Sequence, residues 1–312
     1  MALQENARDA GFAINRLGSA MGAEIIGLDL NVPLDDATFA VLHETMQSHH
    51  LLCFRDQHNL TDDSQLAFTE RWGPLEVFPE ADKTKTESTV YHVANVSPDG
   101  VHLAEDDPQV VFQKVNARWH TDSSYRHIPS LASIMFGTEV LPDEAEGGET
   151  EFSNMLMAYD ALTDEMKRQI EPLHMVHYYE FGRRIYPDLP PISAVEREVV
   201  PPTCHPLVRV HPDRASAGGK GRRSLFLTTN AGNEVSGMTL EAGQTLHKQL
   251  AAHAGTPDFC YRHRWRLHDL VMWDNRVLLH RARPYEMEKY RRVFRRTTVA
   301  GAGPVVGPYS IS

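Results

Sequence analysis

Apolar residues recur along the chain with two periods, and each period predicts a type of element. Spacings of three and four positions predict helices over residues 36–48, 61–72, 156–170 and 239–254. Short apolar or alternating runs predict strands, two of them within 12–30 and the others over 51–57, 131–140, 150–152, 259–264, 269–274 and 292–299. A hairpin is predicted from 206–210 and 224–229, around a turn rich in Gly, Lys and Arg.

The order of these elements predicts a fold that is mainly β with flanking helices. Strands dominate the middle and C-terminal parts, and the helices lie between them, which is typical of a double-sheet jelly roll with helices packed outside. Two long segments interrupt the pattern, over 76–118 with one strand-like piece at Thr89–Val96, and over 171–204. Both are predicted to be lid-like loops over an active site, because long loops in compact domains are usually functional or disordered.

Size and composition add limits to this picture. The chain has 312 residues, 41% of them hydrophobic, and no internal repeat, so residues 1–312 are predicted to form a single domain. The net charge of −11 argues against a nucleic-acid partner. No apolar run approaches the roughly 20 residues that span a membrane, and the N-terminus lacks the features of a signal peptide. Cys53, Cys204 and Cys260 are predicted to be buried thiols, and the cytoplasm is the expected location.

The segment Trp119-His120-Thr121-Asp122 is the first candidate for chemistry. On a strand, residues two apart point to the same side, so His120 and Asp122 can face one metal ion. One carboxylate and two imidazoles make the facial triad of non-haem Fe(II) oxygenases. A His-x-Asp pair alone is more often structural, so this hypothesis needs a second histidine elsewhere.

The C-terminal third offers that histidine and a reason to expect an anionic ligand. The apolar run Val277–Leu279 ends at His280, although a histidine in this position is more often a packed core residue. An arginine-dense strand follows at 291–296. Buried arginines need partners, and a carboxylate cosubstrate would be one.

Several segments together resemble a known family. WHTDSSY, GGETEFSNM, VMWDNRVLLHRARPY and YRRVFRRTT are similar to the taurine dioxygenase / aryloxyacetate dioxygenase (TauD/TfdA) family of Fe(II)/2-oxoglutarate-dependent oxygenases. The resemblance runs from about residue 20 to residue 300 and is closest to the aryloxyacetate branch, notably at FCYRHRWRLHDLVMWDNR. It implies a double-stranded β-helix, and Fe(II), 2-oxoglutarate and O2 as cofactors.

The resemblance also implies roles for single residues. His120, Asp122 and His280 match the iron ligands of the family. The presence of Asp122 favours an oxygenase over a halogenase, since halogenating relatives have a small residue there. Thr150 matches a threonine that binds the distal carboxylate of 2-oxoglutarate, although the local sequence alone favours an ordinary strand residue after a turn.

The arginine strand leaves one choice open. Arg292 and Arg296 share one face of a strand, and Arg291 and Arg295 share the other. The family pattern assigns Arg292 to 2-oxoglutarate, but His280 and Arg292 are twelve positions apart, one more than expected, so Arg291 is the alternative. Arg296 is expected to hold an anion of the substrate, about 13 Å further along the strand. By their positions, two further residues are expected in the substrate pocket: Asn116 and Ser123.

These roles imply an enzyme that hydroxylates a small organic carboxylate, such as an aryloxyacetate, and releases succinate and CO2. An alkylsulfonate or alkylsulfate oxygenase, or an oxidative desaturase or cyclase, would use the same residues. A zinc hydrolase or a binding protein with a jelly-roll fold is a rival from another class, but it leaves Thr150 and Arg292 unexplained. The expected partner is a small anionic substrate, and the resemblance implies a homo-oligomer.

Overall fold

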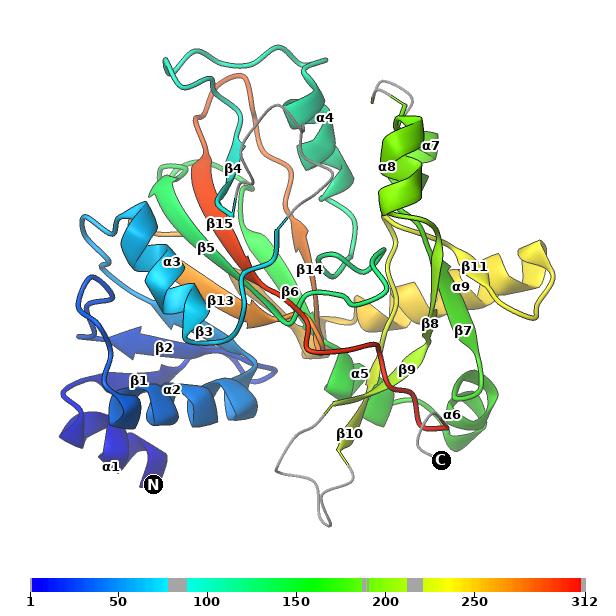
Figure 1. The fold of residues 1–312 in the computed structure, drawn as a ribbon, viewed down its shortest axis with the longest axis horizontal. Helices are drawn as coiled ribbons and strands as arrows, with labels where there is room; N and C mark the ends of the chain where they lie inside the picture. Colours follow the sequence, from blue (N-terminus) through cyan, green and yellow to red (C-terminus); the bar gives the residue numbers. More distant parts are fainter. Residues whose placement is uncertain (1, 78–88, 187–188, 190, 212–220, 310–312) are drawn as a thin grey trace.

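The computed structural model describes residues 2–77, 89–186, 189, 191–211 and 221–309. Figure 1 shows a large twisted sheet with helices against one side and several smaller sheets against the other. Within the described residues, no helix is long and apolar enough to cross a membrane. Cys53 is buried as predicted, whereas Cys204 is exposed and Cys260 is partly exposed, so the prediction of three buried thiols was wrong for two of them.

The large sheet has seven strands in the order β1-β2-β3-β13-β5-β15-β4. Neighbouring strands are antiparallel, except for β2 and β3, which are parallel. The long strand β5 lies between β13 and β15, which come from the C-terminal end of the chain. The strands have these bounds: β1 Ala13–Arg16, β2 Ala23–Ile26, β3 Leu51–Phe54, β4 Tyr91–Ala94, β5 Ala132–Glu139, β13 Leu270–Asp274 and β15 Val293–Val299.

Three smaller sheets complete the described strands. Their orders are β12-β6-β14, β11-β7-β8 and β10-β9. The pair β9–β10 is the predicted hairpin, with its second strand two residues earlier than expected. The strands have these bounds: β6 Thr150–Asn154, β7 His174–His177, β8 Thr203–Pro206, β9 Val208–His211, β10 Arg222–Leu225, β11 Glu234–Val235, β12 Cys260–His263 and β14 Leu278–Ala282.

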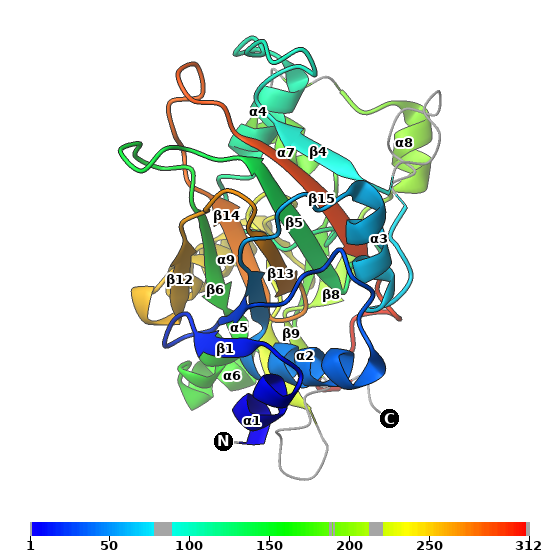
Figure 2. The same ribbon diagram turned by 90° about the vertical axis from the view of Figure 1, so that its left-hand side faces the viewer.

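Helices lie outside the sheets. Figure 2 shows α1, α2 and α3 against the outer face of the large sheet, and α9 lies behind, near the smaller sheets. The helices have these bounds: α1 Ala2–Asp9, α2 Asp36–His49, α3 Asp62–Glu70, α4 Pro108–Val115, α5 Met155–Asp160, α6 Asp164–Ile170, α7 Phe181–Ile185, α8 Ala194–Val199, α9 Leu240–Ala254 and the 3-10 helix η1 Pro257–Phe259.

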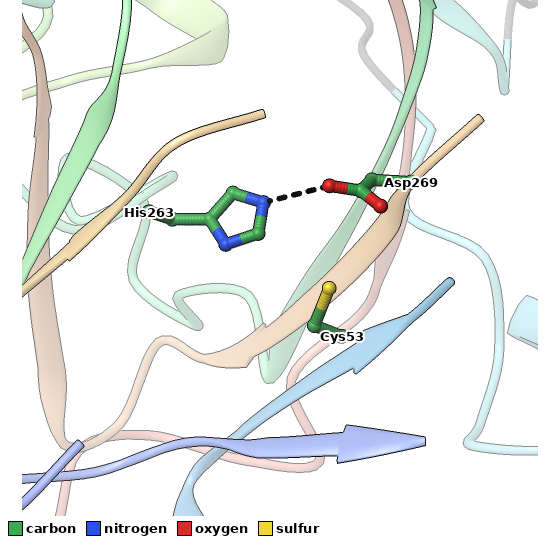
Figure 3. Close-up of side chains that lie close together, drawn as sticks. All are labelled: Cys53, His263 and Asp269. Carbon is green, nitrogen blue, oxygen red and sulfur yellow. Dashed lines mark ion pairs between the residues drawn. The ribbon is translucent and has the colours of Figure 1, made fainter. Parts of the chain in front are cut away.

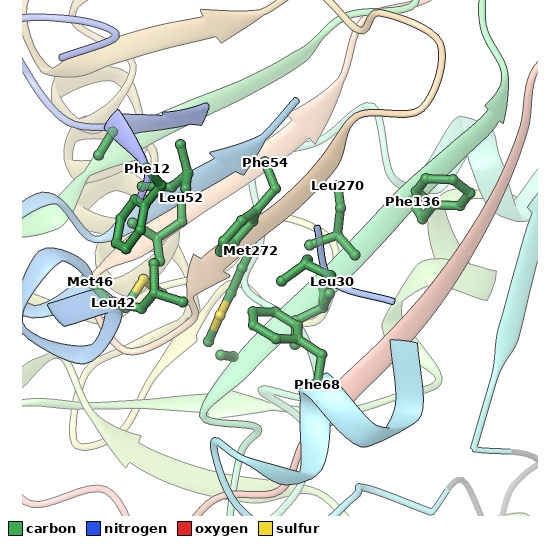
Figure 4. Close-up of a cluster of buried hydrophobic side chains, with 14 of the residues drawn as sticks. Phe12, Leu30, Leu42, Met46, Leu52, Phe54, Phe68, Phe136, Leu270 and Met272 are labelled. Carbon is green, nitrogen blue, oxygen red and sulfur yellow. The ribbon is translucent and has the colours of Figure 1, made fainter. Parts of the chain in front are cut away.

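Both faces of the large sheet are buried, and the side chains of β3 show how. Leu52 and Phe54 pack under α1, α2 and α3, in the hydrophobic cluster drawn in Figure 4. Leu51 and Cys53 point the opposite way, into a second cluster shared with β6 and β14. Because successive strand residues alternate between faces, this one short apolar run serves two cores. The space between the large sheet and the sheet β12-β6-β14 is therefore a second core.

The prediction of a mainly β fold with flanking helices is confirmed, and the differences are local. The helix predicted over 156–170 is two helices, because the side chain of Thr163 accepts a hydrogen bond from the backbone N–H of Met166 and begins α6 anew. The segments 76–118 and 171–204 hold more regular structure than the predicted loops. In their described parts they contain β4 and α4, and β7, α7 and α8, respectively.

Candidate functional site

Three side chains of metal-binding type meet between the large sheet and β14. His120, Asp122 and His280 each offer one ligand atom, and these atoms lie within 4.8 Å of one another. Nε2 of His120 is 3.9 Å from Oδ1 of Asp122, and Nε2 of His280 is 3.7 Å from Oδ2 of Asp122. All three side chains are buried. The structure thus brings together the three residues that the sequence nominated as iron ligands.

The backbone holds the two histidines side by side. His120 and His280 form an isolated antiparallel bridge, in which each N–H donates to the carbonyl of the other at 3.0 and 2.7 Å. The prediction that the His-x-Asp pair lies on a strand was wrong: Asp122 lies in the turn that follows the bridge. Ser123 in this turn has φ of +54°, a left-handed conformation, and the turn brings the carboxylate back toward the imidazoles.

The protonation states of the triad suit a divalent cation. Burial lowers the pKa of His120, and it lowers that of His280 to about 3, so both imidazoles are neutral at neutral pH. His120 donates from Nδ1 to the carbonyl of Arg118 at 2.8 Å, which leaves the lone pair on Nε2. Burial raises the pKa of Asp122, but Arg296 and the two histidines outweigh this effect and hold it below its usual range. Two neutral nitrogens and one carboxylate are therefore available as ligands.

A hydrogen-bond network fixes the carboxylate of Asp122. Ser133 on β5 donates to Oδ2 at 2.6 Å. The side-chain amide of Asn275 in turn donates to Ser133 at 2.9 Å and to Ser130 at 3.0 Å. Trp273 donates from its indole N–H to Oδ1 of Asn275 at 3.0 Å. Asn275 therefore contacts the carboxylate of Asp122 indirectly, through Ser133.

A cavity of about 440 Å³ opens beside the triad. His120 and His280 line it, together with Thr150 on β6 and Arg292 just before β15. Apolar groups make up much of the remaining wall, and they include Val93, Met135, Trp273, Ala282, Pro284 and Met287. Its volume lies in the usual range for small-molecule sites.

Arg292 is the charged group of this cavity, and its surroundings call for an anion. The residue is only 4% exposed, and its guanidinium lies 4.1 Å from the ring centre of Phe294. Nε donates to the carbonyl of Gly148 at 3.2 Å, but no carboxylate of the described residues pairs with it. Burial lowers the pKa of Arg292 to about 10, so the group stays charged at neutral pH. A buried, unpaired guanidinium that lines a cavity is suited to bind a carboxylate ligand.

The neighbouring arginines point elsewhere. Arg291 pairs with Glu139 at 2.7 Å on the surface, and Arg295 pairs with Asp62 at 2.7 Å. Both residues therefore pair with acidic side chains of the protein. The sequence left open whether Arg291 or Arg292 binds the cosubstrate. Of these two arginines, Arg292 lines the cavity of about 440 Å³, and so does Thr150.

Arg296, Asn116 and Ser123 come together next to His120 and Asp122 of the triad. A smaller cavity of about 80 Å³ is lined by all three, and Arg296 and Asn116 line the larger cavity as well. Arg296 forms an ion pair with one of the candidate metal ligands: its Nη1 lies 2.9 Å from Oδ1 of Asp122. Ser123 donates to the buried carboxylate of Glu76 at 2.5 Å. Sequence reasoning missed Glu76, which it placed at the start of a loop.

A second group of metal-binding type lies elsewhere, in the core below β3. Figure 3 shows Cys53, His263 and Asp269 turned toward one another, with Nε2 of His263 3.3 Å from Asp269. Arg55 donates to the same carboxylate at 2.5 Å, which already neutralises its charge. Burial raises the pKa of the Cys53 thiol, and Asp269 adds to this effect, so the sulfur stays protonated. These contacts favour a structural polar cluster over a metal site.

Comparison with known proteins agrees with this geometry. The family model described as "Taurine catabolism dioxygenase TauD, TfdA family" matches residues 13–298. The chain belongs to this family. It is therefore a 2-oxoglutarate-dependent dioxygenase, with Fe(II), 2-oxoglutarate and O2 as cofactors.

Proteins similar to this dioxygenase include two that are named for phenoxy acids. It is 35% identical to the alpha-ketoglutarate-dependent 2,4-dichlorophenoxyacetate dioxygenase of Cupriavidus pinatubonensis, over 92% of this chain and 98% of the relative. It is 34% identical to the (S)-phenoxypropionate/alpha-ketoglutarate-dioxygenase of Sphingobium herbicidovorans, over 93% of this chain and 95% of the relative. The crystal structure of AAD-2 with Mn(II) and N-oxalylglycine is similar, with a TM-score of 0.81 and 35% identity over 94% of this chain and 100% of that one.

Proposed function

We propose that this dioxygenase hydroxylates a small organic carboxylate of the aryloxyalkanoate type and releases succinate and CO2. The observation that carries the proposal is the cavity of about 440 Å³, which is lined by His120 and His280 of the triad and by the unpaired, buried Arg292. In such a cavity, the histidines can bind a metal ion, and the arginine can bind the far carboxylate of a dicarboxylate.

Within this proposal, two sets of residues hold the cofactors. His120, Asp122 and His280 hold Fe(II), and Thr150 with Arg292 binds the distal carboxylate of 2-oxoglutarate. Fe(II) and 2-oxoglutarate together supply the activation of O2. The hydrogen bonds that reach Asp122 from Ser133 and Arg296 keep the carboxylate oriented toward the histidines.

The substrate is proposed to bind where the two cavities meet. Arg296 and Asn116 line both cavities, and Ser123 lines the smaller one. A guanidinium beside the metal site suits the carboxylate of the substrate, and the apolar wall around Met135 and Trp273 suits an aryl group. The names of the 2,4-dichlorophenoxyacetate and (S)-phenoxypropionate dioxygenases support an aryl ether carboxylate. Hydroxylation of the carbon next to the ether oxygen gives a hemiacetal, which collapses, so an aryloxyacetate yields a phenol and glyoxylate.

Further features of the proposal concern the whole chain. The two facing sheets support a double-stranded β-helix, formed by residues 1–312 as a single domain. The segments 76–118 and 171–204 are proposed as its lids, because their described residues Gln113, Lys114 and Tyr186 line the larger cavity. A cytoplasmic location and a homo-oligomeric state remain predictions from the sequence.

The proposal is tested by anaerobic titration with Fe(II) and 2-oxoglutarate, followed by turnover in air. We expect the weak visible charge-transfer band of the iron chelate, and its loss in the variant His280→Ala. Phenoxyacetate and phenoxypropionate should then stimulate O2-dependent release of succinate, with a phenol as the second product. Stimulation by alkyl sulfates or alkylsulfonates alone would favour the sulfur-substrate alternative, and absence of the band at saturating metal would refute the cosubstrate site.

A further inference from the structure

Trp265 is a buried tryptophan that contacts a residue of the proposed cosubstrate site without lining the cavity. It lies two residues after β12 and is 6% exposed. Its indole N–H donates to Oγ1 of Thr150 at 3.0 Å. Its ring lies edge-on to Phe294, with 4.6 Å between the ring centres, and Phe294 in turn lies under the guanidinium of Arg292.

The direction of the hydrogen bond has a chemical consequence. An indole N–H can only donate, whereas a hydroxyl carries one donor and two acceptor positions. Thr150 must therefore accept from Trp265, and this is the hydrogen bond that its side chain makes among the described residues. The hydroxyl proton of Thr150 is left to donate, and a carboxylate can only accept.

The surroundings of Trp265 keep its ring in place. His263 lies edge-on to it, with 4.8 Å between the ring centres and 86° between the ring planes. His263 is itself held in the polar cluster of Figure 3, with Nε2 3.3 Å from Asp269 and Nδ1 3.2 Å from the hydroxyl of Tyr261. Phe294 limits movement on another side. A residue of the core cluster therefore packs directly against the tryptophan.

We propose that Trp265 is a positioning residue for 2-oxoglutarate, which turns the hydroxyl proton of Thr150 toward the distal carboxylate. This inference rests on the proposed function, because it takes Thr150 and Arg292 as the groups that bind this carboxylate. Trp265 does not touch the cosubstrate and acts through Thr150.

The test is a double-mutant cycle on the Fe(II)-loaded enzyme, with the dissociation constant of 2-oxoglutarate measured by anaerobic titration. Trp265→Phe keeps an aromatic ring and removes the N–H. We expect it to weaken binding about 3- to 10-fold, the range for loss of one hydrogen bond. In the background of Thr150→Val the same change should have less than about a twofold effect, because its partner is gone. Equal losses in both backgrounds would mean that Trp265 acts by packing alone, and would overturn the proposal.

A second probe separates positioning from general damage to the fold. 2-Oxopentanoate lacks the distal carboxylate, so Trp265→Phe should leave its binding unchanged. A loss as large as that for 2-oxoglutarate contradicts the proposal. Trp72→Phe is the matched control, since the indole N–H of Trp72 is buried without a hydrogen-bond partner in the described structure. If the wild-type enzyme binds no 2-oxoglutarate, the proposed function fails; if it binds and Trp265→Phe binds equally well, only this inference fails.

Discussion

Arg291 and Arg292 are adjacent in sequence and differ in every contact. Arg292 is buried over Phe294 and lines the cavity, whereas Arg291 pairs with Glu139 at the surface. We predict that Arg292→Ala raises the dissociation constant of 2-oxoglutarate about 10- to 100-fold, because a charge-assisted, two-point contact with the distal carboxylate is lost. Arg291→Ala is the matched control and should change it less than about twofold. If the two results are exchanged, the register of the strand in solution differs from the one described.

The two clusters of metal-binding residues give a second prediction for single residues. The triad of His120, Asp122 and His280 offers two neutral imidazoles beside a cavity. In the core cluster, the thiol of Cys53 stays protonated and Arg55 pairs with Asp269. We predict one Fe(II) or Co(II) ion per chain, measured by equilibrium dialysis under anaerobic conditions. His280→Ala should abolish binding, and Cys53→Ala should leave one ion per chain. Two ions in the wild type, reduced to one by Cys53→Ala, would show that the core cluster does bind metal.

The sheet β12-β6-β14 carries an ion-pair ladder on its outer face. Glu151 on β6 lies directly opposite Arg262 on β12 and Arg281 on β14, at 2.7 and 2.6 Å. The side chain of Glu151 is 8% exposed, and its carboxylate pairs with one arginine from each neighbouring strand. This arrangement links the strand of Thr150 to the strand of His280.

We predict that Glu151→Gln lowers the free energy of unfolding by about 1–3 kcal/mol, since two arginines then face each other across an uncharged residue. Urea denaturation followed by circular dichroism measures the change. Glu139→Gln breaks a more exposed ion pair with Arg291 and should cost less than about 1 kcal/mol. Equal, small losses for both variants would show that the ladder contributes no more than a surface pair.

At the scale of elements, the sequence predicted the helices and strands whose own residues show a clear apolar spacing. The strands of the large sheet and the helices α2, α3 and α9 follow from apolar spacing and capping residues. Helix α4 was missed, although Asp107 as N-cap and Pro108 at the first helical position are a helix start signal. The polar residues around it hid a short apolar face of Val110, Val111 and Val115.

The sequence predicted the site residues that lie in recognisable motifs. The three triad residues and Thr150 lie in segments that resemble the family, so each could be named from the sequence. The contacts of the residues that support them could not be predicted, because positions along the chain do not show which side chains meet in space. Trp265 is 115 positions from Thr150, and Ser133 reaches Asp122 through a side-chain contact that no spacing rule describes.

The whole molecule buries several neutral histidines, which gives its stability a defined pH dependence. Burial lowers the pKa of His177 well below its ordinary value and lowers that of His205 to about 4. The unfolded chain therefore binds more protons than the folded one below pH 6.5, and the free energy of unfolding falls as the pH falls toward 4. Each such group contributes up to about 1.4 kcal/mol per pH unit.

We predict that His177→Phe reduces this acid sensitivity. The side chain of His177 is fully buried against Phe226, and neither ring nitrogen has a hydrogen-bond partner among the described residues. Comparing urea denaturation at pH 7 and pH 5 should show a smaller loss of stability in this variant than in the wild type. His174→Phe removes an exposed histidine of the same strand and should leave the loss unchanged. Parallel pH curves for all three proteins would contradict the prediction.

The order of strands in the large sheet also bears on how the protein is made. Strand β5 has β13 and β15 as its two neighbours, and both are synthesised about 130 residues or more after it. At roughly 5–20 residues per second, the ribosome delivers these partners about six to thirty seconds later. Until then, the nascent chain carries an apolar strand with two open edges, which is a template for aggregation. Chains that stop before about residue 270 never acquire these partners, so premature termination yields a product that depends on chaperones or is degraded.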